Sequence, residues 1–284
     1  MAILLAGCEK NINFKLKDEP PQMVVEATIE NDQWPKVLLS HSVGFFSQIS
    51  INLLENIFVH DAEVYISDGS LTHKLKEYTV PVAPGLNLYY YSIDSAHLNT
   101  AFRGTLSHAY SLRIVSGGQE YNANTTIPQI TKKIDSIWWK PAPANSDTTK
   151  VVVMVRATDK KGFGNYVRYF TKRNNEPFYP PLNSVFDDLF IDGTTYELQL
   201  DPGVDRNAPR NDDEHYFNRG DTVTLKLCEI DKATFDFWRT MEYSYASIGN
   251  PFSTPTTVLS NISNNALGYF GGYAAQFRTL VIQH

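Results

Sequence analysis

The sequence is poor in cysteine: its 284 residues include two, Cys8 and Cys228. If Cys8 carries another group, Cys228 has no partner within the chain and no intrachain disulfide forms. We therefore expect stability to come from a hydrophobic core, which a chain of this length can bury without disulfides or metals. Cys228 lies in the strand-like run TVTLKLCEI, where we interpret it as a small packed apolar side chain.

The sequence also lacks a basic stripe and a long internal apolar run. Lys and Arg together number 25 against 31 Asp and Glu, which gives a formal net charge of -6. No stretch interleaves basic and aromatic residues in the way that a nucleic-acid groove requires, so we expect no nucleic-acid partner. No internal apolar run approaches the ~18–20 residues that a membrane-spanning helix needs.

Motifs of enzyme and metal chemistry are missing as well. The seven histidines are scattered without an HExxH motif, and the chain has no G-x-S-x-G elbow and no P-loop. We therefore predict a protein that is not an enzyme and assign no catalytic residue, metal ligand or cofactor.

Two acidic runs are the candidates that a paired-acid hydrolase or a calcium site could use. Neither run has the regular ligand spacing of a calcium loop, and acidic loop residues are usually solvated turn formers or helix caps. The residues are Asp187, Asp188 and Asp192 in FDDLFIDG, and Asp212, Asp213, Glu214 and His215 in NDDEH.

Aromatic side chains are abundant, with 16 Tyr, 16 Phe and 4 Trp. Flat and branched side chains suit a pleated sheet, so the composition predicts a mainly β fold. Residues 22–127 alternate short strand-like runs with turn residues, including Asp68-Gly69 and Gly117-Gly118 at two expected hairpins. This pattern predicts an N-terminal immunoglobulin-like β-sandwich.

A linker is predicted at residues 128–133, around TIPQITKK. Residues 134–284 are again strand-like and predict a second β-rich domain carrying one α-helix near residues 231–246. Asp231 is a suitable N-cap, and a stripe at helical spacing is expected to pack on the sheet: Phe235, Trp238, Met241 and Tyr245. Close backbone approach or a strand bend is indicated by Gly268, Gly271 and Gly272.

Adjacent aromatic residues are the remaining binding candidates: Tyr89, Tyr90 and Tyr91, and Trp138 with Trp139. Side chains alternate between the faces of a strand, so we expect at least one ring of each set to lie outside the core. Such a ring could stack on a sugar or pack on a partner protein, or it could cover a sheet edge.

The N-terminal run Leu5-Ala6-Gly7-Cys8 matches a lipobox, in which the cysteine thiol accepts a diacylglycerol and becomes the mature N-terminus. Several acyl chains then hold the protein to the membrane, since each buried methylene contributes ~0.8 kcal/mol. We interpret residues 1–8 as a signal remnant and residues 9–21 as a polar tether. Only seven residues and no Lys or Arg precede Cys8, so a short apolar start with a chance cysteine stays open.

Several motifs occur in an order that resembles a known family: VVEATIEND, DAEVYISDG, GGQEYNANTTIP, GFGNYVRYFTKRN, RGDTVTLKLCEIDKATFDFWRTME and GNPFSTPTTVLSNISNNALGYFGGYA. Together with the lipobox they resemble the Bacteroidota outer-membrane lipoproteins classed as a domain of unknown function. The resemblance implies an outer-membrane protein, lipid-anchored through Cys8 and exposed at the cell surface. It also implies a partner, a TonB-dependent receptor-like barrel, for which the protein is a non-enzymatic accessory or binding subunit. The alternative is a stand-alone glycan- or ligand-binding lipoprotein.

Overall fold

The computed structural model describes residues 20–44, 47, 50–143, 147–208, 215–250, 252–254 and 256–284. Cys8, the predicted signal remnant 1–8 and all but the last two residues of the predicted tether 9–21 lie outside the described residues. Within them the fold is mainly β, as predicted, with two sheets and two α-helices. No described helix combines the length and the apolar character that a membrane-spanning helix needs.

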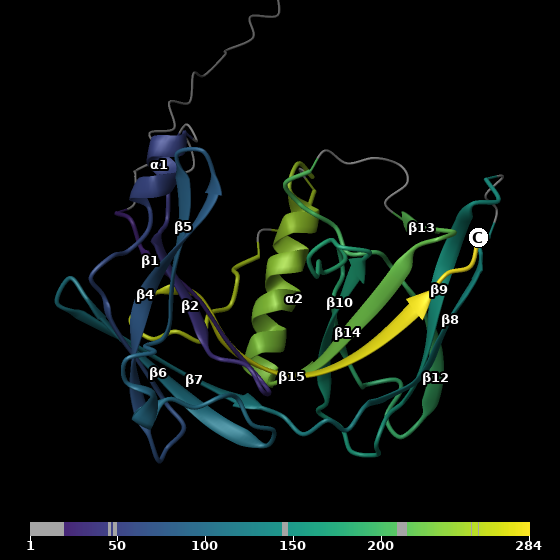
Figure 1. Ribbon diagram of the computed structural model, residues 1–284, viewed down its shortest axis with the longest axis horizontal. Helices are drawn as coiled ribbons and strands as arrows, with labels where there is room; N and C mark the ends of the chain where they lie inside the picture. Colours follow the sequence, from purple (N-terminus) through teal and green to yellow (C-terminus); the bar gives the residue numbers. More distant parts are fainter. Residues whose placement is uncertain are drawn as a thin grey trace, which may run out of the picture.

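The larger described sheet has eleven strands in the order β11-β10-β14-β15-β1-β2-β5-β4-β3-β6-β7 and runs through both lobes of the molecule (Figure 1). Its strands are β1 (Met23–Glu30), β2 (Lys36–His41), β3 (Glu63–Ser67), β4 (Thr72–Ala83), β5 (Leu86–Ile93), β6 (His108–Ser116), β7 (Gln119–Ile127), β10 (Tyr166–Arg173), β11 (Val185–Asp187), β14 (Thr222–Ile230) and β15 (Leu267–Val281). The short helix α1 (Ile51–Asn56) and the 3-10 turn η1 (Leu98–Thr100) lie in the first lobe.

The first lobe closes around the inner faces of β1 to β7. In β1 the alternate residues Val25, Ala27 and Ile29 are fully buried, as the two-residue period of a strand requires. The predicted hairpin between β6 and β7 is present, and Gly117 and Gly118 both have positive φ, at 57° and 75°. The predicted hairpin between β3 and β4 is present too. The immunoglobulin-like character of the lobe stays a prediction.

The second lobe is a sandwich of the larger sheet and a small sheet. The small sheet contains β8 (Lys133–Pro141), β9 (Lys150–Thr158), β12 (Thr195–Leu200) and β13 (Phe217–Asn218). Its inner face meets β10, β14 and the end of β15 in a core that includes Val153, Val167, Phe217 and Leu225. The opposite face of β10, β14 and β15 is therefore free to receive a helix.

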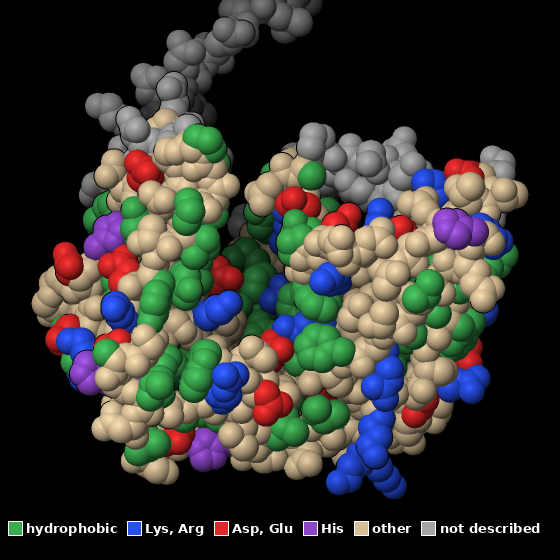
Figure 2. All heavy atoms as spheres, viewed as in Figure 1, with side chains coloured by type: hydrophobic (Ala, Val, Ile, Leu, Met, Phe, Trp, Pro, Cys, Tyr) green, Lys and Arg blue, Asp and Glu red, His purple; other side chains and the backbone are tan. Residues whose placement is uncertain are grey.

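Helix α2 (Lys232–Ser247) covers that opposite face and lies between the two lobes (Figure 1), whose surfaces Figure 2 shows in the same view. As predicted, Asp231 is the N-cap, because its carboxylate accepts a hydrogen bond from the Thr234 N–H at 2.8 Å. Phe235 is buried, and Trp238 and Met241 pack on the sheet, also as predicted. The prediction for Tyr245 is wrong. Its side chain is 51% exposed, because the apolar cluster on this face ends one turn earlier and the ring packs instead beside the Arg206 guanidinium.

Strand β15 joins the lobes, because it pairs in parallel with β1 and antiparallel with β14. The expected close approach at its glycines is confirmed on both faces. A Cβ at Gly271 would lie 3.0 Å from the Thr234 side chain of α2, and a Cβ at Gly272 would lie 2.4 Å from the Thr126 carbonyl oxygen of β7. The division into domains 22–127 and 134–284 stays a prediction, and β15 contributes to the cores on both sides of it.

The predicted linker 128–133 is packed against the second lobe. The buried Glu229 carboxylate accepts hydrogen bonds from the backbone N–H groups of Thr131 and Lys132, the latter at 2.5 Å, and from the Thr131 hydroxyl at 2.9 Å. The Lys132 side chain is itself buried, with its Nζ 2.9 Å from Asp159 Oδ1. A carboxylate and a lysine therefore order the chain where it passes between the lobes.

Candidate functional site

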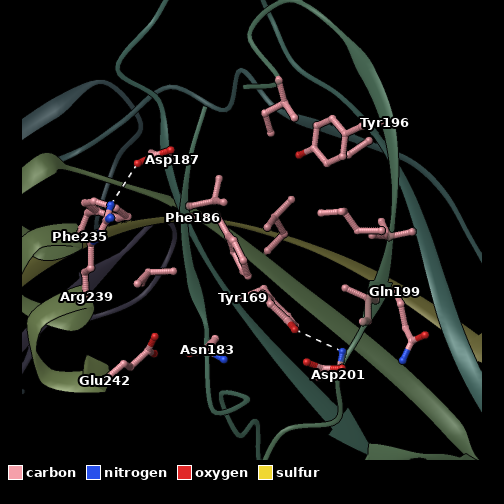
Figure 3. Close-up of a pocket in the computed structure, with 18 of the residues that line it drawn as sticks. Tyr169, Asn183, Phe186, Asp187, Tyr196, Gln199, Asp201, Phe235, Arg239 and Glu242 are labelled. Carbon is pink, nitrogen blue, oxygen red and sulfur yellow. Dashed lines mark hydrogen bonds and ion pairs between the residues drawn. The ribbon is translucent and has the colours of Figure 1, made fainter. Parts of the chain in front are cut away.

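A cavity of about 820 Å³ opens at the side of the second lobe, between its two sheets and beside α2 (Figure 3). We call it the sandwich cleft. It lies between two edge strands, β11 of the larger sheet and β12 of the small sheet, which do not pair with each other. Strand β11 has three residues, so this edge of the larger sheet is too short to cover the core of the second lobe. The inner surface of the sandwich is therefore accessible from this side.

The floor of the sandwich cleft is apolar. It is formed by the inward-facing residues of β9, β10 and β14, including Val155, Val167, Leu225 and Leu227. These residues are also part of the core of the second lobe. The cavity volume falls in the ~300–1,000 Å³ range of pockets that hold small ligands, which are likewise mostly apolar with a few polar groups.

Large apolar side chains stand exposed around the mouth. Phe190 is 96% exposed and Leu189 is 64% exposed, and Phe186 and Leu198 are exposed as well. All four line the cleft. Single exposed apolar residues are normal, but a group of them around an apolar cavity is typical of a binding surface. In the sequence, the segment FDDLFIDG was a candidate because of its carboxylates. The structure instead places two apolar residues of this segment, Leu189 and Phe190, at the mouth of the cleft.

A few polar groups line the cleft (Figure 3). The Tyr169 hydroxyl accepts a hydrogen bond from the Asp201 N–H at 3.3 Å, and burial is the main reason why the pKa of Tyr169 is raised. Burial also raises the pKa of Tyr196, so both phenols are neutral donors at physiological pH. Arg239 Nη1 lies 3.2 Å from Asp187 Oδ2 and forms an ion pair with it.

Glu242 of α2 contributes a further carboxylate to the lining. It accepts hydrogen bonds from the Ser184 hydroxyl and, at 3.0 Å, from the Ser184 N–H. The same hydroxyl accepts a hydrogen bond from Arg168 Nε at 3.0 Å, and the Arg168 guanidinium lies 3.3 Å from the ring centroid of Trp238. This network fixes α2 against β10 and holds the wall of the cleft in place.

Three carboxylates meet elsewhere in the second lobe: one oxygen each of Asp159, Asp188 and Asp192 lies within 4.8 Å of the other two. Two of them belong to FDDLFIDG. Lys132 Nζ lies 2.9 Å from Asp159 and supplies a positive charge inside this cluster. The Gly162 N–H donates to Asp192 at 2.5 Å. Protein groups therefore already contact each of the three carboxylates.

Asp188 shows what the cluster does for the fold. Burial by itself raises its pKa, but hydrogen bonds from the N–H groups of Asn165 and Gly164, at 3.0 and 3.1 Å, and from the Asn165 side chain outweigh that effect and lower the pKa. The ionised carboxylate therefore ties the loop before β10 to the loop after β11, and we assign these acids a structural role. In NDDEH, the described residue His215 is exposed, and Asp212, Asp213 and Glu214 lie outside the described residues.

The adjacent aromatic residues do not form one surface. Tyr91 is buried and its hydroxyl donates to the Val59 carbonyl at 2.9 Å, whereas Tyr89 and Tyr90 are half-buried on β5 in the first lobe. Trp138 and Trp139 are half-buried on β8 in the second lobe. The expectation that each set places a ring outside the core is therefore met.

The two cysteines have different outcomes. Cys228 is fully buried among α2-facing apolar residues, as predicted, and burial raises the pKa of its thiol to about 12. Cys8, predicted as the lipid anchor, lies outside the described residues.

A comparison with known protein families matches residues 9–278 to the family described as Domain of unknown function (DUF4249). The match spans most of the 284 residues, so the chain belongs to this family. This confirms the expectation of a family classed as a domain of unknown function. A search among curated proteins finds no match.

Proposed function

We propose that the protein is a lipid-anchored, non-enzymatic binding protein of the bacterial outer membrane, exposed at the surface of a Bacteroidota cell. In this proposal it is an accessory subunit of a TonB-dependent receptor-like barrel and holds a ligand in the sandwich cleft. The lipobox at Leu5-Ala6-Gly7-Cys8 and the family resemblance support the anchor and the partner. The observation that carries the binding role is the apolar cavity with exposed apolar residues around its mouth.

The chemistry of the lining favours binding over catalysis. The described lining residues include no Ser, Thr, Cys, His or Lys, so they supply none of these nucleophiles and bases. Two of the three lining carboxylates already contact protein groups, Asp187 with Arg239 and Glu242 with Ser184. An apolar cavity with neutral phenols is suited to hold a ligand rather than to transform it.

The anchor is tested in the natural host by comparing the wild type with Cys8→Ala. We expect the wild type in the outer-membrane fraction, with an N-terminal peptide that carries acyl chains in mass spectrometry, and the variant in the soluble fraction. An unmodified, uncleaved N-terminus would contradict the anchor.

The partnership is tested by purification from membranes solubilised in a mild detergent. We expect a barrel protein to co-purify with the wild type. Recovery of the chain as a lone monomer under these conditions, with the anchor present, would contradict the accessory role and leave the binding role standing.

A stand-alone glycan-binding lipoprotein is the second candidate. The ring of half-buried Trp138, with Lys140 Nζ and the Arg156 guanidinium 5.7 and 6.0 Å from its centroid, favours it because sugars stack on such rings between polar groups. Glycan-array binding that is lost in Trp138→Ala and kept in Tyr90→Ala would place the sugar on β8. Binding that is unchanged in both variants would exclude these two rings.

A further inference from the structure

The charges that line the sandwich cleft are mainly negative. Its described lining contains three carboxylates, Asp187, Asp201 and Glu242, and one cationic side chain, Arg239. Arg239 is already paired with Asp187, so its charge is largely compensated. Glu242 is hydrogen-bonded to Ser184, so the carboxylate that remains without a protein partner among the described lining residues is that of the exposed Asp201, next to an apolar floor.

The acidic groups have a definite place in the cleft. In Figure 3, Glu242, Asn183, Asp201 and Gln199 lie along one end, while Tyr196 and Phe186 lie farther toward the other. Asp201 is exposed at that end, and within the described residues no ion-pair partner contacts its carboxylate. The Asp201 carboxylate is therefore available to a charged group of a ligand.

The aromatic lining is compatible with cations. Tyr169 is the lining ring beside Asp201, because its hydroxyl accepts a hydrogen bond from the Asp201 N–H at 3.3 Å. Aromatic faces attract ammonium groups through the ring quadrupole, and carboxylates nearby add to the attraction. An anionic head group would instead lose its hydration and face like charges.

We propose that the sandwich cleft binds a small amphiphile with a cationic, alkylammonium-type head, its apolar part on the floor of the sandwich and its head near Asp201. This inference rests on the proposed binding function and adds the class of ligand. A fatty acid of the same chain length fits the apolar floor equally well, so the head group is what discriminates.

The test uses the full chain with the substitution Cys8→Ala. Because this variant carries no lipid, it needs no detergent, and detergent would compete for the cleft. The neutral fluorophore N-phenyl-1-naphthylamine reports occupancy of the cleft. It is then displaced by decyltrimethylammonium or by undecanoate, two ligands with the same ten-carbon alkyl chain and head groups of opposite charge. We expect the ammonium compound to displace the fluorophore at a concentration about three- to tenfold lower, because an exposed carboxylate attracts the ammonium head and repels the carboxylate head by similar small amounts.

Two sets of variants locate the effect. Asp201→Asn should reduce the preference and Asp201→Lys should reverse it; both change an exposed side chain, and circular dichroism verifies the fold. Leu198→Glu, at the mouth, should weaken fluorophore binding. Val82→Glu is the matched control, because Val82 is also an exposed strand residue but lies on β4 in the first lobe.

The outcomes separate the two proposals. If the fluorophore binds and Leu198→Glu weakens it, but both displacers act equally or Asp201→Lys leaves their ranking unchanged, the cationic ligand class is refuted and the binding function stands. If the fluorophore does not bind, or Leu198→Glu and Val82→Glu behave alike, the cleft is not a ligand site and both proposals fail.

Discussion

The buried ion pair between Lys132 and Asp159 should contribute strongly to the stability of the fold. Lys132 lies in the predicted linker, a position that a sequence reader would expect to be solvated, yet its side chain is 1% exposed and is among the largest fully buried side chains described. Its Nζ lies 2.9 Å from Asp159 Oδ1, and the Asp159 side chain has no exposed surface. Lys132→Met keeps most of the apolar stem and removes the charge.

The expected loss follows from this burial. Removal of one partner leaves the other charge buried without compensation, which costs about 3–5 kcal/mol. Native proteins have a free energy of unfolding of about 5–15 kcal/mol, so this single change should remove a large part of the stability. The double variant Lys132→Met/Asp159→Asn carries no uncompensated charge, and we expect it to regain at least half of the loss.

Urea unfolding followed by tryptophan fluorescence measures these free energies. The matched control is Lys74→Met, since Lys74 also pairs with a carboxylate, Glu63 at 2.7 Å, but both side chains are about half exposed. We expect little change in the unfolding midpoint for this control. The reasoning is refuted if Lys132→Met behaves like Lys74→Met, or if the double variant loses as much as the two single variants together.

Two further substitutions and one thiol assay test other buried groups. Burial raises the pKa of Glu229 in the folded state. The stability that its protonated form contributes is therefore fully present below the unfolded-state pKa of about 4.5 and is lost as the pH rises through the folded-state pKa. The difference in free energy of unfolding between the wild type and Glu229→Gln, measured in urea, should accordingly shrink as the pH rises above about 4.5. The Asp231 carboxylate caps α2 and also accepts hydrogen bonds from the Thr125 hydroxyl and the Thr126 N–H of β7. Asp231→Ala removes these contacts and should lower the free energy of unfolding by about 2–3 kcal/mol. A loss below about 0.5 kcal/mol would show that the contacts between Asp231 and β7 do not stabilise the fold. Cys228, with a thiol pKa of about 12, should not react with Ellman's reagent in the native protein; after unfolding, host-purified protein should release one equivalent if Cys8 carries lipid and two if it does not.

Local patterns predicted the parts of the fold that local physics decides. Alternation and turn residues indicated the strands, and Gly117 and Gly118 indicated a hairpin because few other residues adopt positive φ at two successive positions. Asp231 and the helical spacing after it predicted α2 to within a residue or two. Tyr245 was misplaced by the same reasoning, because spacing gives the face of a helix but not how far along it the sheet extends.

The candidate site was predicted only in part. The segment FDDLFIDG attracted notice for its acids, and the structure shows Asp187 in an ion pair and Asp188 tying two loops together. Phe190 gave no signal in the sequence, because an apolar residue beside a strand is ordinarily buried. Its exposure depends on two features of the packed sheets: β11 is a short edge strand, and β12, the edge strand of the other sheet, does not pair with it.

By itself the sequence determined a mainly β chain with one long helix. It also contains a lipobox that suggests an anchor at Cys8, and a modified Cys8 would leave Cys228 without a disulfide partner in the chain. Only the tertiary structure decided that β15 pairs with β1 from the opposite end of the chain, that a lysine in the predicted linker is buried, and that one side of the sandwich in the second lobe stays open. The physical reason is the distance along the sequence over which each kind of interaction acts. Turns, caps and alternation depend on neighbours within a few residues, whereas burial and cavities depend on which distant strands pair and where each sheet ends.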